Sequence, residues 1–134
     1  MDCFIIEGPS KVEGEVVVSG SKNSALAILF ASILTDEKCV LSGVPELSDI
    51  KTTYELLSYC GKSCFFGFNR FEISESKELA TEAPYDLVRK MRASVLIAGP
   101  MLSRFRRVRF SMPGGCAIGV RPIDIHLEGF KKFG

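Results

Sequence analysis

Runs of hydrophobic residues, interrupted by glycine and proline, predict two short strands at the start of the chain. The first run, residues 4–7, stops at Gly8-Pro9, and the second, residues 14–18, ends in three valines before Ser19-Gly20. Runs of β-branched and aromatic residues bounded by turn-forming residues are typical of strands. We therefore expect the segment before Ser21 to form two strands.

The pattern then alternates between helical and strand-like spacing. Expected are a helix over residues 25–34, a strand over 39–44, a helix from Ser48 or Asp49 to Gly61, and a hairpin over 63–68 and 71–74. Serine and aspartate commonly cap helix N-termini, and glycine commonly ends helices. The hairpin turn is expected around Gly67, Asn69 and Arg70, because glycine and asparagine accept the backbone of tight turns.

The second half predicts a further series of elements. They are a helix over residues 87–98 capped by Asp86, a strand over 107–112, a loop over 113–119 and a helix over 122–133. Proline removes a helical hydrogen bond, so Pro100 predicts a kink or an early stop in the first of these helices. Pro122 lies near the first turn of the last helix, where proline is tolerated.

The two halves share short similarities roughly 70 residues apart, which indicates an internal repeat. Ser24-Ala25-Leu26 corresponds to Ser94-Val95-Leu96, and in both halves a strand and a helix follow. The first copy continues into two further strands, and the second copy stops before them. Because repeats bury their faces against neighbouring copies, we expect an α/β chain that is cut in mid-repeat.

Composition and charge exclude several classes of protein. The 134 residues are 46% hydrophobic and 25% charged, and 17 Lys+Arg against 16 Asp+Glu leave a net charge of +1. This composition excludes intrinsic disorder, and so small a charge gives no bulk field for nucleic acid or an anionic membrane. The longest apolar stretch, residues 25–34, is too short to span a bilayer. Any affinity for an anion must therefore come from a few well-placed cations.

The five cysteines and the start of the chain indicate a cytoplasmic protein. Met1-Asp2-Cys3-Phe4 has none of the features of a secretory signal, and an odd number of cysteines favours reduced thiols. Cys60 and Cys64 lack the C-x-x-C spacing, and His126 is not placed to complete a zinc set. No metal site is expected.

The first candidate site is Ser19-Gly20-Ser21-Lys22-Asn23-Ser24, at a junction between a strand and a helix. The free N–H groups of a helix N-terminus attract anions. Lys22 adds a full positive charge, and Asn23 can donate and accept hydrogen bonds. The alternative is an ordinary helix cap with a solvated lysine.

The second candidate site is the glycine-rich stretch 112–122 around Cys116. Two glycines before the cysteine allow close approach of the backbone to a ligand. Arg121 would favour the Cys116 thiolate if the loop folds back. The alternative is an incidental thiol, a description that suits Cys39, Cys60 and Cys64 better because they lie in helix or strand patterns.

Arginines are the candidates for holding an anion. Arg104, Arg106, Arg107 and Arg109 alternate along the chain and predict a solvated face rather than a contact with nucleic acid. Arg92 and Arg121 suit a phosphate or carboxylate better, because a guanidinium binds both in a bidentate manner.

Four motifs in one order identify a family resemblance. They are Ser-Lys-Asn-Ser at 21–24, Met-Arg-Ala-Ser at 91–94, Pro-Gly-Gly-Cys-Ala-Ile-Gly at 113–119 and Arg-Pro-Ile-Asp-Ile-His at 121–126. Together they resemble the UDP-N-acetylglucosamine enolpyruvyl transferases, which catalyse the first committed step of peptidoglycan synthesis for the bacterial cell wall. The similarity extends from Phe4 to Gly129, and the cysteine loop is its most specific part.

The resemblance implies a two-domain enzyme made of repeated βαβαββ units, an inside-out α/β barrel that is incomplete here. Residues 1–21 would be strands of one domain, and residues 22–134 the first repeat and part of the second repeat of the other. The substrates would be phosphoenolpyruvate and UDP-N-acetylglucosamine, with no cofactor.

Site roles follow from the same resemblance. Phosphoenolpyruvate would meet Lys22, Asn23 and Arg121, and the UDP-sugar would meet Asn23, Arg92 and the stretch Arg121, Pro122, Ile123, Asp124 and Ile125. Cys116 would donate a proton to the methylene carbon of the enol or attack the adjacent carbon as a thiolate. These two roles need opposite protonation states, and both stay open. In this family the cysteine is also the target of fosfomycin.

The chain departs from the family pattern in two respects. Ser21 stands where relatives commonly have alanine, and the family is several times longer, so the fragment is expected to be inactive alone. The shikimate-pathway enolpyruvyl transferase is an alternative, although it lacks the cysteine loop. A non-catalytic remnant that binds nucleotide sugars is another.

Overall fold

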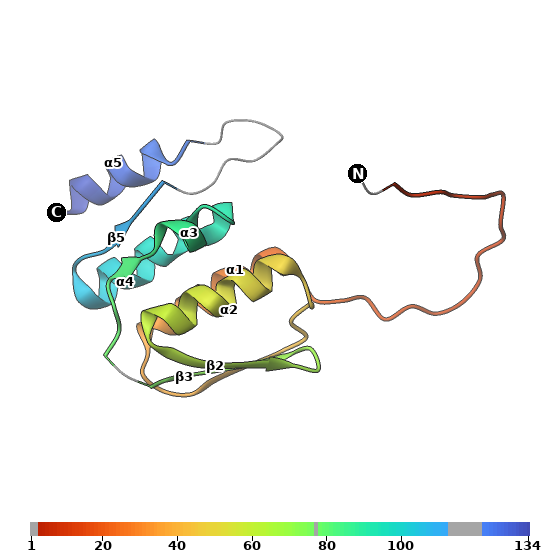
Figure 1. Cartoon of the computed structure of the whole chain (residues 1–134), viewed down its shortest axis with the longest axis horizontal. Helices are drawn as coiled ribbons and strands as arrows, with labels where there is room; N and C mark the ends of the chain where they lie inside the picture. The colour runs from red at the N-terminus through yellow and green to blue at the C-terminus, as the bar shows by residue number, and fades with distance from the viewer. Residues whose placement is uncertain (1–2, 77, 113–121) are drawn as a thin grey trace.

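The computed structural model describes residues 3–76, 78–112 and 122–134 as a mixed α/β structure. Its elements in chain order are α1 (Lys22–Ala31), the 3₁₀ helix η1 (Ser32–Leu34), β1 (Cys39–Ser42), α2 (Ser48–Cys60), β2 (Lys62–Gly67), β3 (Arg70–Glu75), β4 (Glu82–Ala83), α3 (Tyr85–Val88), the 3₁₀ helix η2 (Arg92–Ile97), α4 (Ala98–Phe105), β5 (Arg109–Phe110) and α5 (Asp124–Phe133). Figure 1 shows α1 and α2 side by side over the sheet that contains β2 and β3.

The first sheet has three antiparallel strands in the order β1-β3-β2. Cys39 is paired with Ile73, and the hairpin pairs Phe66 with Phe71. The predicted strand and hairpin are therefore confirmed. The hairpin turns at Phe68 and Asn69, which both have positive φ, +53° and +56°, as a two-residue turn of type I′ requires.

Phe68 is a poor residue for this turn, which leads to a prediction. Its side chain is fully exposed, so it makes no packing contribution to offset the left-handed backbone, which residues other than glycine and asparagine avoid. Phe68→Asn is expected to raise the free energy of unfolding by about 0.5–1 kcal/mol. Thermal unfolding followed by circular dichroism measures this change, and a lower melting temperature than wild type would contradict it.

Helices α1 and α2 confirm the two helices predicted in the first half. Ser21 caps α1 by accepting a hydrogen bond from the backbone N–H of Ser24 at 3.4 Å. Gly61 ends α2 with a left-handed backbone of φ +111°. The cap predicted at the start of α2 is wrong, because the helix begins after the extended residue Leu47 and Asp49 lies within the first turn.

The hydrophobic core lies between the helices and the sheet. Its largest fully buried side chains in this region are Leu29, Phe30, Ile33, Ile50, Leu56, Leu57, Phe71 and Ile73. They come from α1, η1, α2 and β3, and Ile97 and Met101 add the second half of the chain to the same cluster. The sheet and both halves therefore share one core.

The two strands predicted before Ser21 are wrong for the part that the structure describes. Residues 3–20 carry no strand, and hydrophobic side chains such as Phe4, Ile6 and Val17 are 90–96% exposed. Figure 1 shows this segment running away from the helices and the sheet. A strand needs a hydrogen-bonded neighbour, and the described residues offer none here. The assignment of residues 1–21 to a separate domain stays a prediction.

The single helix predicted over residues 87–98 is also wrong. Met91 is extended, with φ −145° and ψ 127°, and separates α3 from η2. Its carbonyl accepts the Ser94 hydroxyl at 2.6 Å, and its buried sulfur lies 3.9 Å from the Thr53 hydroxyl. The contact with Ser94 is local, whereas the contact with Thr53 is tertiary and outweighs the local helical pattern. Asp86 is no cap, because α3 begins after Pro84.

The remaining elements of the second half form a crossover. Strands β4 and β5 are parallel, with Glu82 opposite Arg109, and α3, η2 and α4 connect them. Pro100 is the third residue of α4, where its missing N–H is tolerated, and the helix continues to Phe105, so the predicted early stop does not occur. β5 is shorter than the predicted strand, α5 confirms the last helix, and the predicted loop 113–119 lies outside the described residues.

Candidate functional site

The lysine predicted to bind an anion forms an ion pair with an aspartate of the neighbouring helix. Lys22 Nζ donates a hydrogen bond to Asp49 Oδ2 at 2.7 Å. The two side chains are 43% and 30% exposed, so a ligand can reach both. Each residue lies in the first turn of its helix. The packing of α1 against α2 through their buried residues brings the two side chains together.

A close approach of two backbone segments fixes the start of α1. A β-carbon on Gly20 would lie 1.8 Å from the carbonyl oxygen of Gly43, so only glycine fits at position 20. Gly20, Gly43 and Leu47 help to line a pocket of about 560 Å³. The segments that lead into Lys22 and Asp49 therefore form part of the wall of this pocket.

The other predicted site residues are spread over three elements. Asn23 follows Lys22 and is exposed, and Arg92 is the half-buried first residue of η2, which packs against α1. Pro122 and Asp124 are exposed, Ile123 is buried, and Ile125 is 77% exposed at the start of α5. In Figure 1, α5 lies beyond α3 and α4 as seen from α1.

The structure brings only some of these residues together. Lys22 and Asn23 share one helix turn, and η2, whose first residue is Arg92, packs against α1. Among the described residues, no hydrogen bond or ion pair joins residues 122–125 to Lys22 or Asn23. Cys116 and Arg121 lie outside the described residues.

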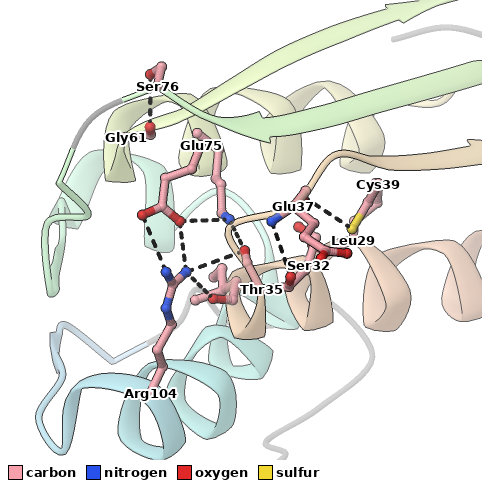
Figure 2. A network of polar contacts seen from close by, with 11 residues as sticks. Leu29, Ser32, Thr35, Glu37, Cys39, Gly61, Glu75, Ser76 and Arg104 are labelled. Carbon is pink, nitrogen blue, oxygen red and sulfur yellow. Dashed lines mark hydrogen bonds and ion pairs between the residues drawn. The ribbon is translucent and has the colours of Figure 1, made fainter.

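A second polar cluster, which the sequence did not predict, links the sheet to α4 (Figure 2). Arg104 donates hydrogen bonds to both carboxylate oxygens of Glu75, at 2.7 and 3.3 Å. The fully buried Lys62 ammonium lies 3.2 Å from Glu75 Oε2 and 2.6 Å from the carbonyl of Thr35. Hydrogen bonds from Arg104, and then from Lys62, hold the pKa of Glu75 below its ordinary value.

This cluster corrects the prediction of a solvated arginine face. Arg106, Arg107 and Arg109 are exposed as expected, whereas Arg104 is half-buried and also donates to the carbonyl of Ile33 at 2.9 Å. Arg104 lies in α4, ahead of the strand predicted over residues 107–112. Since its donors are used within the fold, Arg104 has a structural role.

The described cysteines are free thiols with different environments. Cys60 is completely buried, and burial raises the pKa of its thiol to about 12. Burial also raises the pKa of Cys64. Both residues are therefore protonated and poorly nucleophilic at neutral pH, as expected from their helix and strand positions.

No helix within residues 3–76, 78–112 and 122–134 is both long enough and apolar enough to cross a membrane.

Comparisons with known proteins define the class of this fold. The sequence profile of the EPSP synthase (3-phosphoshikimate 1-carboxyvinyltransferase) family matches residues 6–134. The enolpyruvyl transferase NikO from Streptomyces tendae has a similar crystal structure, with a TM-score of 0.66 and 21% identity over 73% of this chain and 23% of that chain. The chain belongs to the EPSP synthase family, and the predicted enolpyruvate transferase fold is confirmed.

Within this family, two relatives with high sequence identity carry a more particular name. UDP-N-acetylglucosamine 1-carboxyvinyltransferase from Elusimicrobium minutum (strain Pei191) is 57% identical, and its namesake from Endomicrobium trichonymphae is 54% identical. Each alignment covers 100% of this chain and 32% of the relative. The chain thus spans about a third of the length of these relatives.

Proposed function

We propose that this chain is the N-terminal third of a UDP-N-acetylglucosamine 1-carboxyvinyltransferase. The observation that carries the proposal is the 57% identity over all 134 residues to a relative of that name. The reaction would be the first committed step of peptidoglycan synthesis. The reaction would take place in the cytoplasm, where reduced thiols such as those of the four described cysteines persist.

The proposed reaction joins the 3′-hydroxyl oxygen of the sugar to the central carbon of phosphoenolpyruvate. In the addition step, the hydroxyl loses its proton and the methylene carbon gains one, which gives a tetrahedral intermediate. In the elimination step, the bond from the central carbon to the phosphate oxygen breaks and the methyl carbon loses a proton. Inorganic phosphate leaves, and the enolpyruvyl group stays on the sugar.

Lys22 is the proposed cation for phosphoenolpyruvate, together with Arg121 and with Asn23 between the two substrates. Its support is the position of Lys22 at the N-terminus of α1, beside a pocket of about 560 Å³. Cations fixed before the reaction stabilise charge that develops on the phosphate and carboxylate. Arg92, Arg121 and residues 122–125 are the proposed contacts of the UDP-sugar.

Cys116 is the proposed proton donor or nucleophile, and its labelling provides a prediction. Iodoacetamide should alkylate Cys116 faster than the buried Cys60, whose pKa of about 12 leaves almost no thiolate at pH 7. UDP-N-acetylglucosamine should slow the reaction at Cys116 in an enzyme that contains all substrate contacts. Mass spectrometry of the labelled peptides measures both rates, and equal labelling of all five cysteines would contradict the assignment.

A fusion enzyme tests the proposed function directly. This chain would replace the matching third of the Elusimicrobium minutum relative, and phosphate release would be followed with phosphoenolpyruvate and either UDP-N-acetylglucosamine or shikimate 3-phosphate. We expect turnover with the nucleotide sugar only, and none from the chain alone. Turnover with shikimate 3-phosphate would favour the alternative named by the family profile. Binding of the nucleotide sugar without any turnover would indicate a non-catalytic remnant.

A further inference from the structure

We propose that Asp49 is a positioning residue, which holds the Lys22 ammonium group ready for phosphoenolpyruvate. This inference rests on the proposed function of Lys22 and adds a second residue to that site. Its basis is the 2.7 Å hydrogen bond between Lys22 Nζ and Asp49 Oδ2, which joins residues from two different helices.

Asp49 is itself held firmly. It lies in the first turn of α2, and its carbonyl oxygen accepts the hydroxyl of Thr53 at 2.9 Å. Thr53 is completely buried, and so is Ile50, which directly follows Asp49 in the sequence. A carboxylate in the first turn of a helix is also favoured by the helix dipole. The carboxylate therefore provides a fixed point to which a flexible lysine can be tied.

The ion pair leaves Lys22 able to bind an anion. An ammonium group has three N–H donors, and Asp49 uses one of them. The lysine side chain has a long flexible stem, whose freedom would otherwise be lost when the substrate binds. The ion pair restricts that freedom beforehand, which is the physical basis of preorganisation.

Asp49 also has an effect that weakens the binding of an anion by Lys22. The measured affinity of a variant without Asp49 shows which of the two effects is larger. The negative charge of Asp49 repels an incoming phosphate or carboxylate. Both partners are partly exposed, at 43% and 30%, so solvent and salt weaken this repulsion. We therefore expect orientation to outweigh repulsion, and removal of Asp49 to weaken binding rather than strengthen it.

A second ion pair of α2 provides a matched control. Glu55 Oε2 lies 3.0 Å from Lys90 Nζ, and both side chains are 50% exposed. Glu55→Ala removes one carboxylate from the same helix and changes the net charge by the same amount as Asp49→Ala. Any loss that is specific to Asp49→Ala then comes from Lys22.

The experiment measures two properties of the intact chain and its variants. Calorimetric titration gives the affinity for phosphoenolpyruvate, and mass spectrometry gives the rate at which sulfosuccinimidyl acetate acylates Lys22. Asp49→Ala is expected to weaken binding about fivefold and to speed acylation of Lys22. Asp49→Asn, which retains an acceptor, should fall between Asp49→Ala and wild type, and Glu55→Ala should match wild type in both measurements.

The outcomes separate this inference from the proposed function. Loss of binding in Lys22→Ala, with wild-type affinity or tighter binding in Asp49→Ala and Asp49→Asn, overturns the positioning role alone. Equal behaviour of wild type and Lys22→Ala towards phosphoenolpyruvate overturns the proposed role of Lys22 and with it the role of Asp49. Circular dichroism checks folding, and Asp49→Asn decides the matter if Asp49→Ala does not fold.

Discussion

Glu75→Ala is expected to lower the free energy of unfolding by about 3–5 kcal/mol. Without this carboxylate, the fully buried Lys62 ammonium keeps only the carbonyl of Thr35, and Arg104 loses both carboxylate contacts. A buried charge without its counter-charge costs more than the attraction that was lost, because it remains out of water. Urea denaturation measures the effect as a shift of the midpoint at an unchanged slope.

Two further variants make this test specific. Glu72 is on the same strand as Glu75, but its partners Lys38 and Arg70 are on the exposed face. Glu72→Ala should therefore cause a much smaller loss. Lys62→Met, added to Glu75→Ala, should restore part of the stability because it removes the unpaired charge. Equal losses from Glu72→Ala and Glu75→Ala would show that the buried cluster contributes nothing particular.

The same cluster predicts how stability depends on pH. Hydrogen bonds from Arg104 and Lys62 lower the pKa of Glu75 in the folded chain. A glutamate in an unfolded chain has a pKa of about 4.3. A lowered pKa stabilises the fold above that pH, and the stabilisation is lost as the pH falls through the folded value. The stability difference between wild type and Glu75→Gln should therefore be constant at neutral pH and shrink in acid. A difference that grows in acid would contradict this account.

The sequence predicted those elements that local signals determine. Gly61 ends α2, and the hairpin of β2 and β3 forms where expected. Both features depend on the backbone preferences of a few consecutive residues, which the sequence shows directly. The break at Met91 could not be predicted, since it depends on contacts such as that with Thr53 in another helix. The strands expected before Ser21 have the right composition, but strand formation also depends on a neighbour.

The candidate site divides in the same way. Lys22 could be found from its place at a predicted helix N-terminus, which α1 confirms. Its partner Asp49 lies 27 positions away and meets it only through the packing of α1 on α2. Glu75 and Arg104 are 29 positions apart and meet through tertiary structure alone. The sequence predicts an ion pair only when the acidic and the basic residue are three or four positions apart on one helix face. Partners that are distant in sequence cannot be recognised in this way.

Lys22→Ala is expected to lower kcat of the fusion enzyme by about 10²–10³. The proposed reaction moves negative charge onto the phosphate that leaves, and the Lys22 ammonium, fixed by Asp49 at 2.7 Å, would be in place before that charge develops. A donor that is oriented in advance contributes more to the transition state than to the bound substrate. The loss should therefore be larger in kcat/KM than in the affinity for phosphoenolpyruvate measured by titration.

The control for this variant is Lys90→Ala, which removes a lysine that pairs with α2 at 3.0 Å and is half-exposed like Lys22. It should leave both kcat and the affinity for phosphoenolpyruvate near wild type. Lys22→Arg keeps the charge but replaces a compact ammonium with a planar guanidinium, so it should restore binding more fully than turnover. Phosphate release measures kcat, and urea denaturation confirms that the variants are folded. A Lys22→Ala enzyme with wild-type turnover would show that other residues stabilise the charge on the phosphate. The contact of Lys22 with Asp49 would then have no part in the reaction.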